Sequence, residues 1–487
     1  MSSINSLRKN ERVGGEPNPD GSFVLYRMQI NRRLYYNYAL DYAVGWANKL
    51  QKPLLIFEEV RCDYPWASER THHFLMEGMA EHQQELDERG VTHYPFLEDE
   101  PGKLEGLLTR LSEHACIVIS DEFPAFIIPG NNEELAKQIP VPYITIDSNG
   151  ILPLNLTEKA PSSAYNYRRI MQKNFLECFS EPPSEDPLAQ LKLKQQAVIP
   201  ESVLEKWPLA GWRLQDRGKF TSKLPIRQDI GKLEISGTRK AGRERMLTFV
   251  HEELHRYDAD RNHPDEEKTS KLSPWLHFGK VSAYEVVKEI FDQLPDGWRL
   301  DDLEEQKGKR SGFFNADAST EGFLDEIITW REVGFHYCHH VPNYDKYETL
   351  PEWAKETLDQ HSKDERPHIY SYDELANAKT YDEVWNAAQN QLIREGRIHN
   401  YLRMLWGKKV LEWTPDPQTA LQYLIDLNNW YAIDGRDPNS YSGIFWIFGR
   451  FDRAWGPERP IFGKVRYMTS KSAKSKIRLK KYLQRYG

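Results

Sequence analysis

In the first 150 residues, short apolar runs alternate with longer amphipathic stretches, and this alternation restricts the fold more than any other feature of the 487-residue chain. The stretches 33–49, 72–89 and 103–114 carry apolar residues at helical spacing. The apolar runs predict strands at 23–26, 53–58, 93–97, 116–120 and 143–146. Strands that alternate with helices form parallel sheets covered by helices. We therefore expect a Rossmann-like, doubly wound parallel sheet in an α/β domain over 20–150.

The pattern changes after this region. Prolines break 151–235 at several points, so we expect an interdomain linker there. From 236 to 470 the periodicity is helical, with no further alternating strands, which predicts an all-α domain in which 309–320 is an exposed loop. The last 24 residues hold nine Lys or Arg and no acid. For 471–487 we expect a basic tail, which either is solvated or contributes to a face that binds nucleic acid.

Several classes of site have no signature in the sequence. No G-x-G-x-x-G follows an expected strand and no P-loop motif occurs, which argues against an ATP-dependent transferase. The four cysteines lie at least 54 positions apart, a spacing that fits neither a metal site nor a disulfide framework. No apolar run has the length of a membrane span, and the start lacks the apolar region of a secretory signal. We expect a cytoplasmic protein without a metal.

The net charge of −8 argues weakly against nucleic acid as a partner, although the local charge of the binding face matters more.

Downstream of Tyr257 and of the pair Arg261 and Asn262, hydroxyl side chains are grouped just before Pro274 and an apolar run. This grouping is typical of a helix start, whose N–H groups suit a phosphate. An ordinary capped helix is the alternative.

Glu326 and Trp330 are four residues apart and are therefore expected on one face of a helix. A buried acid that hydrogen-bonds a base while the indole stacks on it would explain this pair. The alternative is a Glu that reaches the surface beside a core Trp.

Tryptophans are unusually dense, with eight of the 14 between Trp330 and Trp455. Trp406 and Trp413 are seven apart, hence on the same side of one helix, and Trp385 precedes them. Core packing is the alternative to a row of tryptophans that conducts electrons.

The segment 427–455 combines turn signals, arginines and aromatics. Arg436 and Arg453 could meet phosphates, and Trp446 could stack on a base. A polar loop on a helix bundle is the other explanation.

The segments 382–389, 403–413, 434–439 and 462–468, together with 272–279 and 343–346, resemble the signature segments of class II cyclobutane pyrimidine dimer photolyases in sequence, order and spacing. The similarity runs from about Tyr257 to Met468, and the N-terminal domain matches more loosely. The resemblance implies an α/β antenna domain and an all-helical domain that binds a U-shaped FAD. A second, antenna chromophore of the deazaflavin or folate type is possible in this family.

The resemblance also implies roles for individual residues. The residues implied near the flavin, its phosphates and its ribityl chain are Tyr257, Arg261, Asn262, Thr269, Ser270, Leu272, Ser273, Arg403, Asp434 and Gly435, with Asn428 beside N5. Those implied at the lesion and the DNA are Glu326, Trp330, Met404, Trp446, Arg453 and Arg466, and we add Arg436 to them. Trp385, Trp406 and Trp413 match the tryptophans that photoreduce the flavin.

The implied activity is light-driven repair of cyclobutane pyrimidine dimers, in double- or single-stranded DNA, by electron transfer from excited reduced FAD to a flipped-out dimer. A monomer is expected, associated with the nucleoid or the nucleus. The alternatives are a cryptochrome-like light sensor and a (6-4) photoproduct lyase, the latter because His336, His339 and His340 lie near the site in sequence. The chain departs from the family pattern at 335–337, 400, 429–430 and 451.

Overall fold

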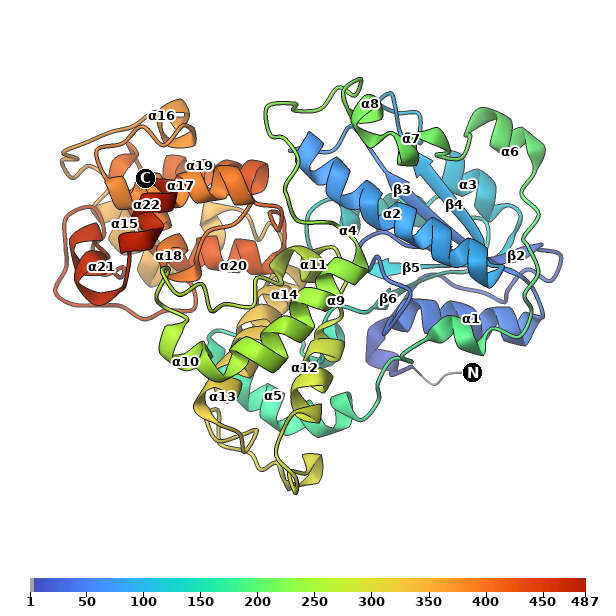
Figure 1. Ribbon diagram of the computed structural model, residues 1–487, viewed down its shortest axis with the longest axis horizontal. Helices are drawn as coiled ribbons and strands as arrows, with labels where there is room; N and C mark the ends of the chain where they lie inside the picture. Colours follow the sequence, from blue (N-terminus) through green and yellow to red (C-terminus); the bar gives the residue numbers. More distant parts are fainter. Residues whose placement is uncertain (1–3) are drawn as a thin grey trace. The chain divides into compact units, whose positions relative to one another are not determined.

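The computed structural model describes residues 4–487, which form two compact units (Figure 1). Unit 1 comprises the chain up to Thr157, then Asn174–Leu247 and Leu272–Asp292. Unit 2 comprises Glu158–Lys173, Thr248–Lys271 and Gln293–Gly487. Each unit is thus assembled from three separate stretches of the sequence, because the chain passes between the units several times.

Unit 1 is built on a six-stranded sheet with the order β1-β6-β5-β2-β3-β4. Its strands are β1 (Lys9–Val13), β2 (Phe23–Arg27), β3 (Leu54–Val60), β4 (Thr92–Leu97), β5 (Ala115–Glu122) and β6 (Tyr143–Asp147). All pairs among β2 to β6 are parallel, which confirms the five expected strands and their doubly wound order. The antiparallel edge strand β1 was not predicted. Its sequence is mostly polar and only half-buried, so it carries no apolar run.

Helices cover both faces of this sheet. They are α1 (Tyr38–Leu50), α2 (Glu69–Arg89), α3 (Leu107–Ser112) and α4 (Ile128–Ala136). Alternate strand residues serve two separate cores: Val24 and Tyr26 pack with α1, whereas Phe23 and Leu25 pack with α3. Helix α1 begins five residues later than the pattern 33–49 indicates, because the Asn37 side chain accepts hydrogen bonds from the N–H groups of residues 39 and 40 and so caps the helix.

The expected linker 151–235 is more regular than its prolines indicate. It contains α5 (Ala164–Phe179), α6 (Glu201–Lys206), α7 (Trp212–Gln215) and α8 (Arg217–Thr221). The prolines at 161, 182 and 183 lie outside α5 and bracket it rather than prevent it. Tyr167 and Phe175 of α5 are fully buried. Unit 1 is completed by α9 (Arg239–Thr248), of which the last residue belongs to unit 2, and by α11 (Ser273–His277) and α12 (Ala283–Asp292).

Unit 2 is helical, and all six strands of the described chain lie in unit 1. The helices of unit 2 are α10 (Tyr257–Asp260), α13 (Ala318–Leu324), the π-helical turn η7 (Asp325–Trp330), α14 (Arg331–His340), α15 (Glu352–Gln360), α16 (Tyr372–Ala376), α17 (Glu383–Glu395), α18 (Asn400–Trp413), α19 (Pro417–Tyr431), α20 (Pro438–Ile447), α21 (Ser470–Lys476) and α22 (Lys480–Tyr486). The expected all-α region is confirmed.

Two segments of unit 2 are better ordered than expected. The loop before α13 is not fully exposed, because Phe313 and Phe314 are buried. The basic tail is not solvated chain, since it folds into α21 and α22 and packs on α17. Tyr482 is buried there and its hydroxyl donates to Gln391 Oε1 at 2.8 Å. Aromatic residues among the basic ones hold the tail on the fold.

Three further observations concern membrane spans, metal ligands and thiols. No helix of the described chain is both long and apolar enough to span a membrane. Residues 4–487 contain no group of three or more His, Cys, Asp or Glu side chains that could hold a metal ion. All four cysteines are buried free thiols.

Candidate functional site

Three tryptophans form a continuous aromatic cluster in unit 2. Trp385 of α17 stacks on Trp406 of α18, with ring centroids 6.3 Å apart and planes inclined by 5°. Trp413, seven residues further along α18, packs against the same Trp385 at 5.6 Å. The indole N–H of Trp385 donates to the Trp406 carbonyl at 3.0 Å, which fixes the rings. Rings in contact at these distances offer a path for an electron through the helix pair.

A tight polar turn lies between α19 and α20. The Asn429 side chain holds it: its Oδ1 accepts from the Asn428 side chain at 3.2 Å and from the backbone N–H of Arg436 at 2.9 Å. Gly435 lies in the turn, and a Cβ there would meet the Asn428 carbonyl oxygen at 2.9 Å. Only glycine fits this close approach, so one of the turn signals in 427–455, the glycine at 435, has a steric cause.

Asp434, in the same turn, is a buried carboxylate with an unusual environment. Its Oδ2 lies 3.8 Å from Arg403 Nη2 on α18, a long ion pair. Its Oδ1 is buried and has no hydrogen-bond partner in the protein. Such an oxygen is costly to bury unless a donor reaches it. The geometry is that of a ligand site whose bound group presents an N–H or O–H.

Arg436 does not occupy the position expected of a DNA contact. It is 3% exposed, and its Nε donates to the Gly435 carbonyl at 2.9 Å. The turn is packed inside the helical unit, which agrees better with the alternative of a polar loop on a helix bundle. The expected contact between Arg436 and DNA phosphates is therefore wrong.

Tyr257, Arg261 and Glu326 form a second polar group. Arg261 Nη2 lies 2.7 Å from Glu326 Oε1, and its guanidinium lies 5.2 Å from the centre of the Tyr257 ring. Burial, and secondly the Glu326 charge, raise the pKa of Tyr257 well above its ordinary value. Arg261 Nη1 is buried and has no partner in the protein. Asn262, the next residue, is exposed.

Glu326 differs from the buried acid that the sequence led us to expect. Its side chain is 26% exposed and ion-paired. The turn η7 that contains Glu326 and Trp330 is π-helical, so the four-residue spacing does not align the two side chains as in an α-helix. Both residues are half-buried. Single π-turns inside helices are frequent at functional sites.

Trp446 of α20 is contacted by two cationic side chains. The Arg466 guanidinium is 5.3 Å from the centre of the Trp446 ring, and Arg466 is held by Asp452 at 2.9 Å. The Lys408 ammonium is 5.0 Å from the same ring and donates to the Ile447 carbonyl at 2.6 Å. Burial lowers the pKa of Lys408 to about 7. Lys408 was not expected at the site, because it lies in a segment whose tryptophans carry the clearer signal. Its only signal in the sequence is a lysine among mostly apolar residues of α18.

The remaining expected residues are more dispersed. Met404 is half-buried on α18, and Arg453 is exposed and lies 4.7 Å from the Trp455 ring. A helix begins at Ser273, as expected, but α11 has only five residues. Leu272 is fully buried and belongs with Ser273 to unit 1, whereas Thr269 and Ser270 belong to unit 2.

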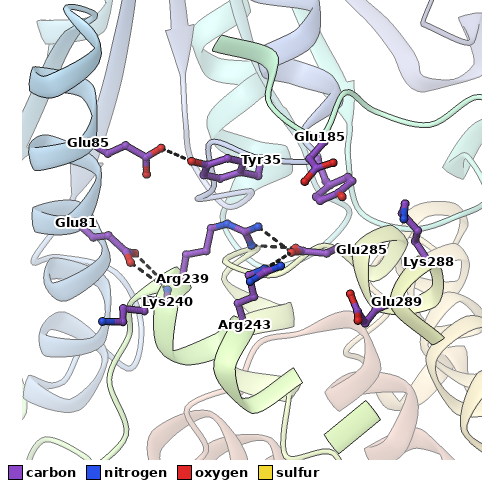
Figure 2. Close-up of a pocket in the computed structure, with 11 residues that line it drawn as sticks. Tyr35, Glu81, Glu85, Glu185, Arg239, Lys240, Arg243, Glu285, Lys288 and Glu289 are labelled. Carbon is purple, nitrogen blue, oxygen red and sulfur yellow. Dashed lines mark hydrogen bonds and ion pairs between the residues drawn. The ribbon is translucent and has the colours of Figure 1, made fainter. Parts of the chain in front are cut away.

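Unit 1 contains a polar cavity of about 350 Å³ that the sequence did not indicate (Figure 2). Glu285 pairs there with Nη1 and Nη2 of the Arg239 guanidinium at 2.9 and 2.8 Å, and Glu85 accepts from the Tyr35 hydroxyl at 2.6 Å. Lys240 lies beside them and donates its backbone N–H to Glu81 at 3.0 Å. Most charges in this cavity neutralise one another, and none of the expected site residues lines it.

Three curated proteins that are similar in sequence to this chain share one name. No family model matches the chain. The deoxyribodipyrimidine photo-lyase of Methanothermobacter thermautotrophicus is 32% identical over 99% of this chain and 98% of its own length. The enzymes of the same name from Oryza sativa subsp. japonica and Arabidopsis thaliana are 31% and 30% identical, over 96% and 94% of this chain and 88% of each relative.

Solved structures agree in fold. A bacterial class III photolyase from Agrobacterium tumefaciens superposes with a TM-score of 0.66 and 14% identity, covering 96% of this chain and 86% of that one. An archaeal photolyase from Sulfolobus tokodaii, solved with two FAD molecules, gives a TM-score of 0.61 and 15% identity, covering 95% and 90%. At these identities the likeness establishes the α/β-plus-helical fold.

Proposed function

Because the chain belongs to the deoxyribodipyrimidine photo-lyase family, we propose that it uses light and a bound FAD to split cyclobutane pyrimidine dimers in damaged DNA. As a member of that family it is a DNA-repair lyase and a flavoprotein. When bound in its reduced form, FAD supplies on excitation the electron that opens the cyclobutane ring. The protein's own residues hold the cofactor, receive the lesion and exclude water.

The turn around Asp434 fits the flavin ring. An isoalloxazine edge presents both an N–H donor and carbonyl acceptors. Asp434 Oδ1 is a buried acceptor without a partner, and the Arg403 guanidinium beside it is a donor. Asn428, buried in the same turn, brings an amide. These three side chains would hold the ring edge, and Gly435 would keep the backbone close.

The other cofactor contacts are proposed from the segment between α10 and α11. Tyr257, Arg261 and Asn262 would lie beside the flavin, and Thr269, Ser270, Leu272 and Ser273 would hold its phosphate and ribityl region. Arg261 Nη1 is a second buried polar atom without a protein partner, which supports a ligand at this position. Donor N–H groups and hydroxyls of this kind are the usual partners of phosphate oxygens.

The lesion would be received by Glu326, Met404, Trp330 and Trp446. A dimer cannot be reached within the base stack, so it must be extruded, and extrusion is cheapest where pairing is already distorted. The Glu326 carboxylate is fixed by Arg261 yet 26% exposed, so it can still accept a hydrogen bond from a base N–H. Trp330 and Trp446 would form the apolar wall. Arg453 and Arg466 would enter the gap left in the duplex.

Recharging of the cofactor is proposed to use the tryptophan cluster. Trp406, Trp385 and Trp413 are in ring-to-ring contact in that order. Each is at most 3% exposed, which keeps a radical away from water during transfer. This cluster is the observation that most directly supports electron-transfer chemistry rather than hydrolysis.

One observation bears on the choice between lesions. His336 is fully buried and packs 5.2 Å from the Tyr167 ring. Burial lowers its pKa to about 3, so it is neutral near pH 7. A histidine that must give a proton to a (6-4) photoproduct would need a higher pKa and access to the lesion. His336 is therefore unsuited to that proton transfer.

The test uses two oligonucleotides, one with a single cyclobutane thymine dimer and one with a single (6-4) photoproduct. The chemically reduced protein is incubated with each in light and in darkness, and the products are separated by chromatography. We expect thymines to be restored only from the cyclobutane dimer and only in light. Repair in darkness, repair of the (6-4) photoproduct alone, or no repair of either would refute the proposal.

A further inference from the structure

The outer end of the tryptophan cluster is not at the surface. Trp413 is only 1% exposed. Two tyrosines cover it: the Tyr370 ring lies at 5.4 Å and the Tyr381 ring at 5.6 Å from the Trp413 ring. An oxidised Trp413 would thus have no direct contact with a reductant in solution. The covering rings offer the shortest aromatic route for the electron that restores it.

Of the two tyrosines, Tyr381 is the one that reaches solvent. It is 58% exposed, whereas Tyr370 is half-buried. The His368 ring packs on Tyr381 at 4.4 Å, so the exposed ring is nevertheless held. An aromatic side chain this exposed has no role in a core, and contact with Trp413 on one side and water on the other makes it a bridge between them.

Backbone hydrogen bonds fix this arrangement. The N–H of Tyr370 donates to the Trp413 carbonyl at 3.0 Å, and the N–H of Tyr381 donates to the Tyr370 hydroxyl at 3.0 Å. Asp382 then caps α17 through the N–H groups of Val384 and Trp385. The three rings therefore share one hydrogen-bonded frame with the helix that carries Trp385.

A cation beside Trp413 favours outward transfer of the positive charge. The Lys409 ammonium lies 5.2 Å from the centre of the Trp413 ring. Its ion pair with Glu412 at 2.7 Å reduces, without removing, the Coulomb repulsion that it exerts on a radical cation at that indole. A tyrosine can lose its phenolic proton to water as it is oxidised and then carries no net charge, so the repulsion is relieved when the oxidised site moves to Tyr381.

We propose that Tyr381 is the solvent-facing end of the electron path, and this rests on the proposed function. The oxidised Trp413 takes one electron from Tyr381, whose phenolic proton passes to water, leaving a neutral tyrosyl radical. A soluble thiol then returns a hydrogen atom, one electron and one proton, to Tyr381 and becomes a thiyl radical. Tyr381 is thereby restored.

The experiment uses the FAD-loaded full chain with oxidised flavin, illuminated by a laser pulse without reductant. Transient absorption should record a tryptophan radical that decays as a neutral tyrosyl radical appears. In Tyr381→Phe, which removes a hydroxyl that has no hydrogen-bond partner within residues 4–487, the tyrosyl signal should be lost and the tryptophan radical should live longer. Tyr370→Phe is the control for the other covering ring. It also removes the hydroxyl that accepts from the Tyr381 N–H, but the Tyr381 ring keeps its contacts with Trp413 and His368, so this variant should retain the tyrosyl signal.

A spin trap added under continuous light gives a second readout. Peptide mass spectrometry of the wild type should find the adduct on Tyr381, and added thiol should suppress it. An unchanged tyrosyl signal in Tyr381→Phe, or an adduct on Tyr370 instead, would overturn the assignment while leaving the tryptophan path intact. A wild type that forms no tryptophan radical would refute the proposed path itself, and the role of Tyr381 with it.

Discussion

Lys408 should make the stability of unit 2 depend on pH above neutrality. Its side chain is fully buried, with the ammonium on the Ile447 carbonyl and over the Trp446 ring. Burial lowers its pKa from 10.5 to about 7; the charge of Asp452 opposes this and that of Arg466 adds to it. The unfolded chain keeps the lysine proton over a range of pH in which the folded chain has lost it.

The direction and the size of the pH effect on the free energy of unfolding follow from this difference in pKa. Between pH 7 and the unfolded pKa of 10.5 the unfolded state binds more protons, so the free energy of unfolding rises with pH. Each pKa unit corresponds to about 1.36 kcal/mol. Integrated from about pH 7 to about pH 9, the contribution of Lys408 is about 2 kcal/mol. The gain is lost again as pH falls back to 7.

The assay is urea unfolding of wild type and Lys408→Met at a series of pH values. Methionine keeps the unbranched apolar stem, and the loss of the bond to Ile447 costs about 1 kcal/mol at every pH. Nine of the 14 tryptophans belong to unit 2, so indole fluorescence reports mainly its unfolding. Between about pH 7 and about pH 9, we expect the free energy of unfolding to rise by about 2 kcal/mol less in the variant than in the wild type.

Lys409→Met is the matched control, one residue along the same helix. Although burial opposes it, the hydrogen bond to Glu412 leaves the pKa of Lys409 raised, so its removal should not flatten the profile. Parallel profiles for wild type and Lys408→Met would refute the reasoning. They would mean that the lysine beside Trp446 keeps its proton, or that it is not buried there.

Three further predictions concern the proposed site and one the tail. Glu326→Ala should lower repair several-fold at unchanged FAD content, and equal repair would dismiss the residue from the lesion pocket. Trp406→Phe should block photoreduction while the chemically reduced protein still repairs; normal photoreduction would indicate another route. Asp434→Asn should reduce the FAD retained after purification, measured by absorbance, and full retention would contradict the proposed ring contact. Tyr482→Ala should lower the free energy of unfolding by about 3 kcal/mol in urea, whereas a tail free in solvent would give no change.

The sheet was predictable because its parallel strands are buried on both faces and so read as uninterrupted apolar runs. Strand β1 lies at the edge, where half-buried polar residues such as Lys9 and Asn10 serve equally well, and no apolar signal marks it. The helix α5 was hidden by the prolines that flank it. Proline marks where a helix ends, but it does not indicate how much helix lies between two ends.

The site was predictable only in part, for a similar reason. Spacing along α18 correctly put Trp406 and Trp413 on one side, because an ordinary α-helix carries them. Glu326 and Trp330 lie in a π-helical turn that no spacing rule detects. Arg436 follows turn residues that usually lie at the surface, yet its guanidinium is packed inside. Burial of a polar side chain depends on tertiary contacts, which local sequence does not encode.

Whether unit 2 binds FAD is decided most directly by denaturing the purified protein and identifying what it releases. The buried acceptor on Asp434, the arginine beside it and the close-packed Gly435 lead us to expect a coloured protein that liberates FAD equimolar with the chain. A colourless protein that also fails to take up added FAD would contradict the proposed cofactor site and the light-driven chemistry that depends on it.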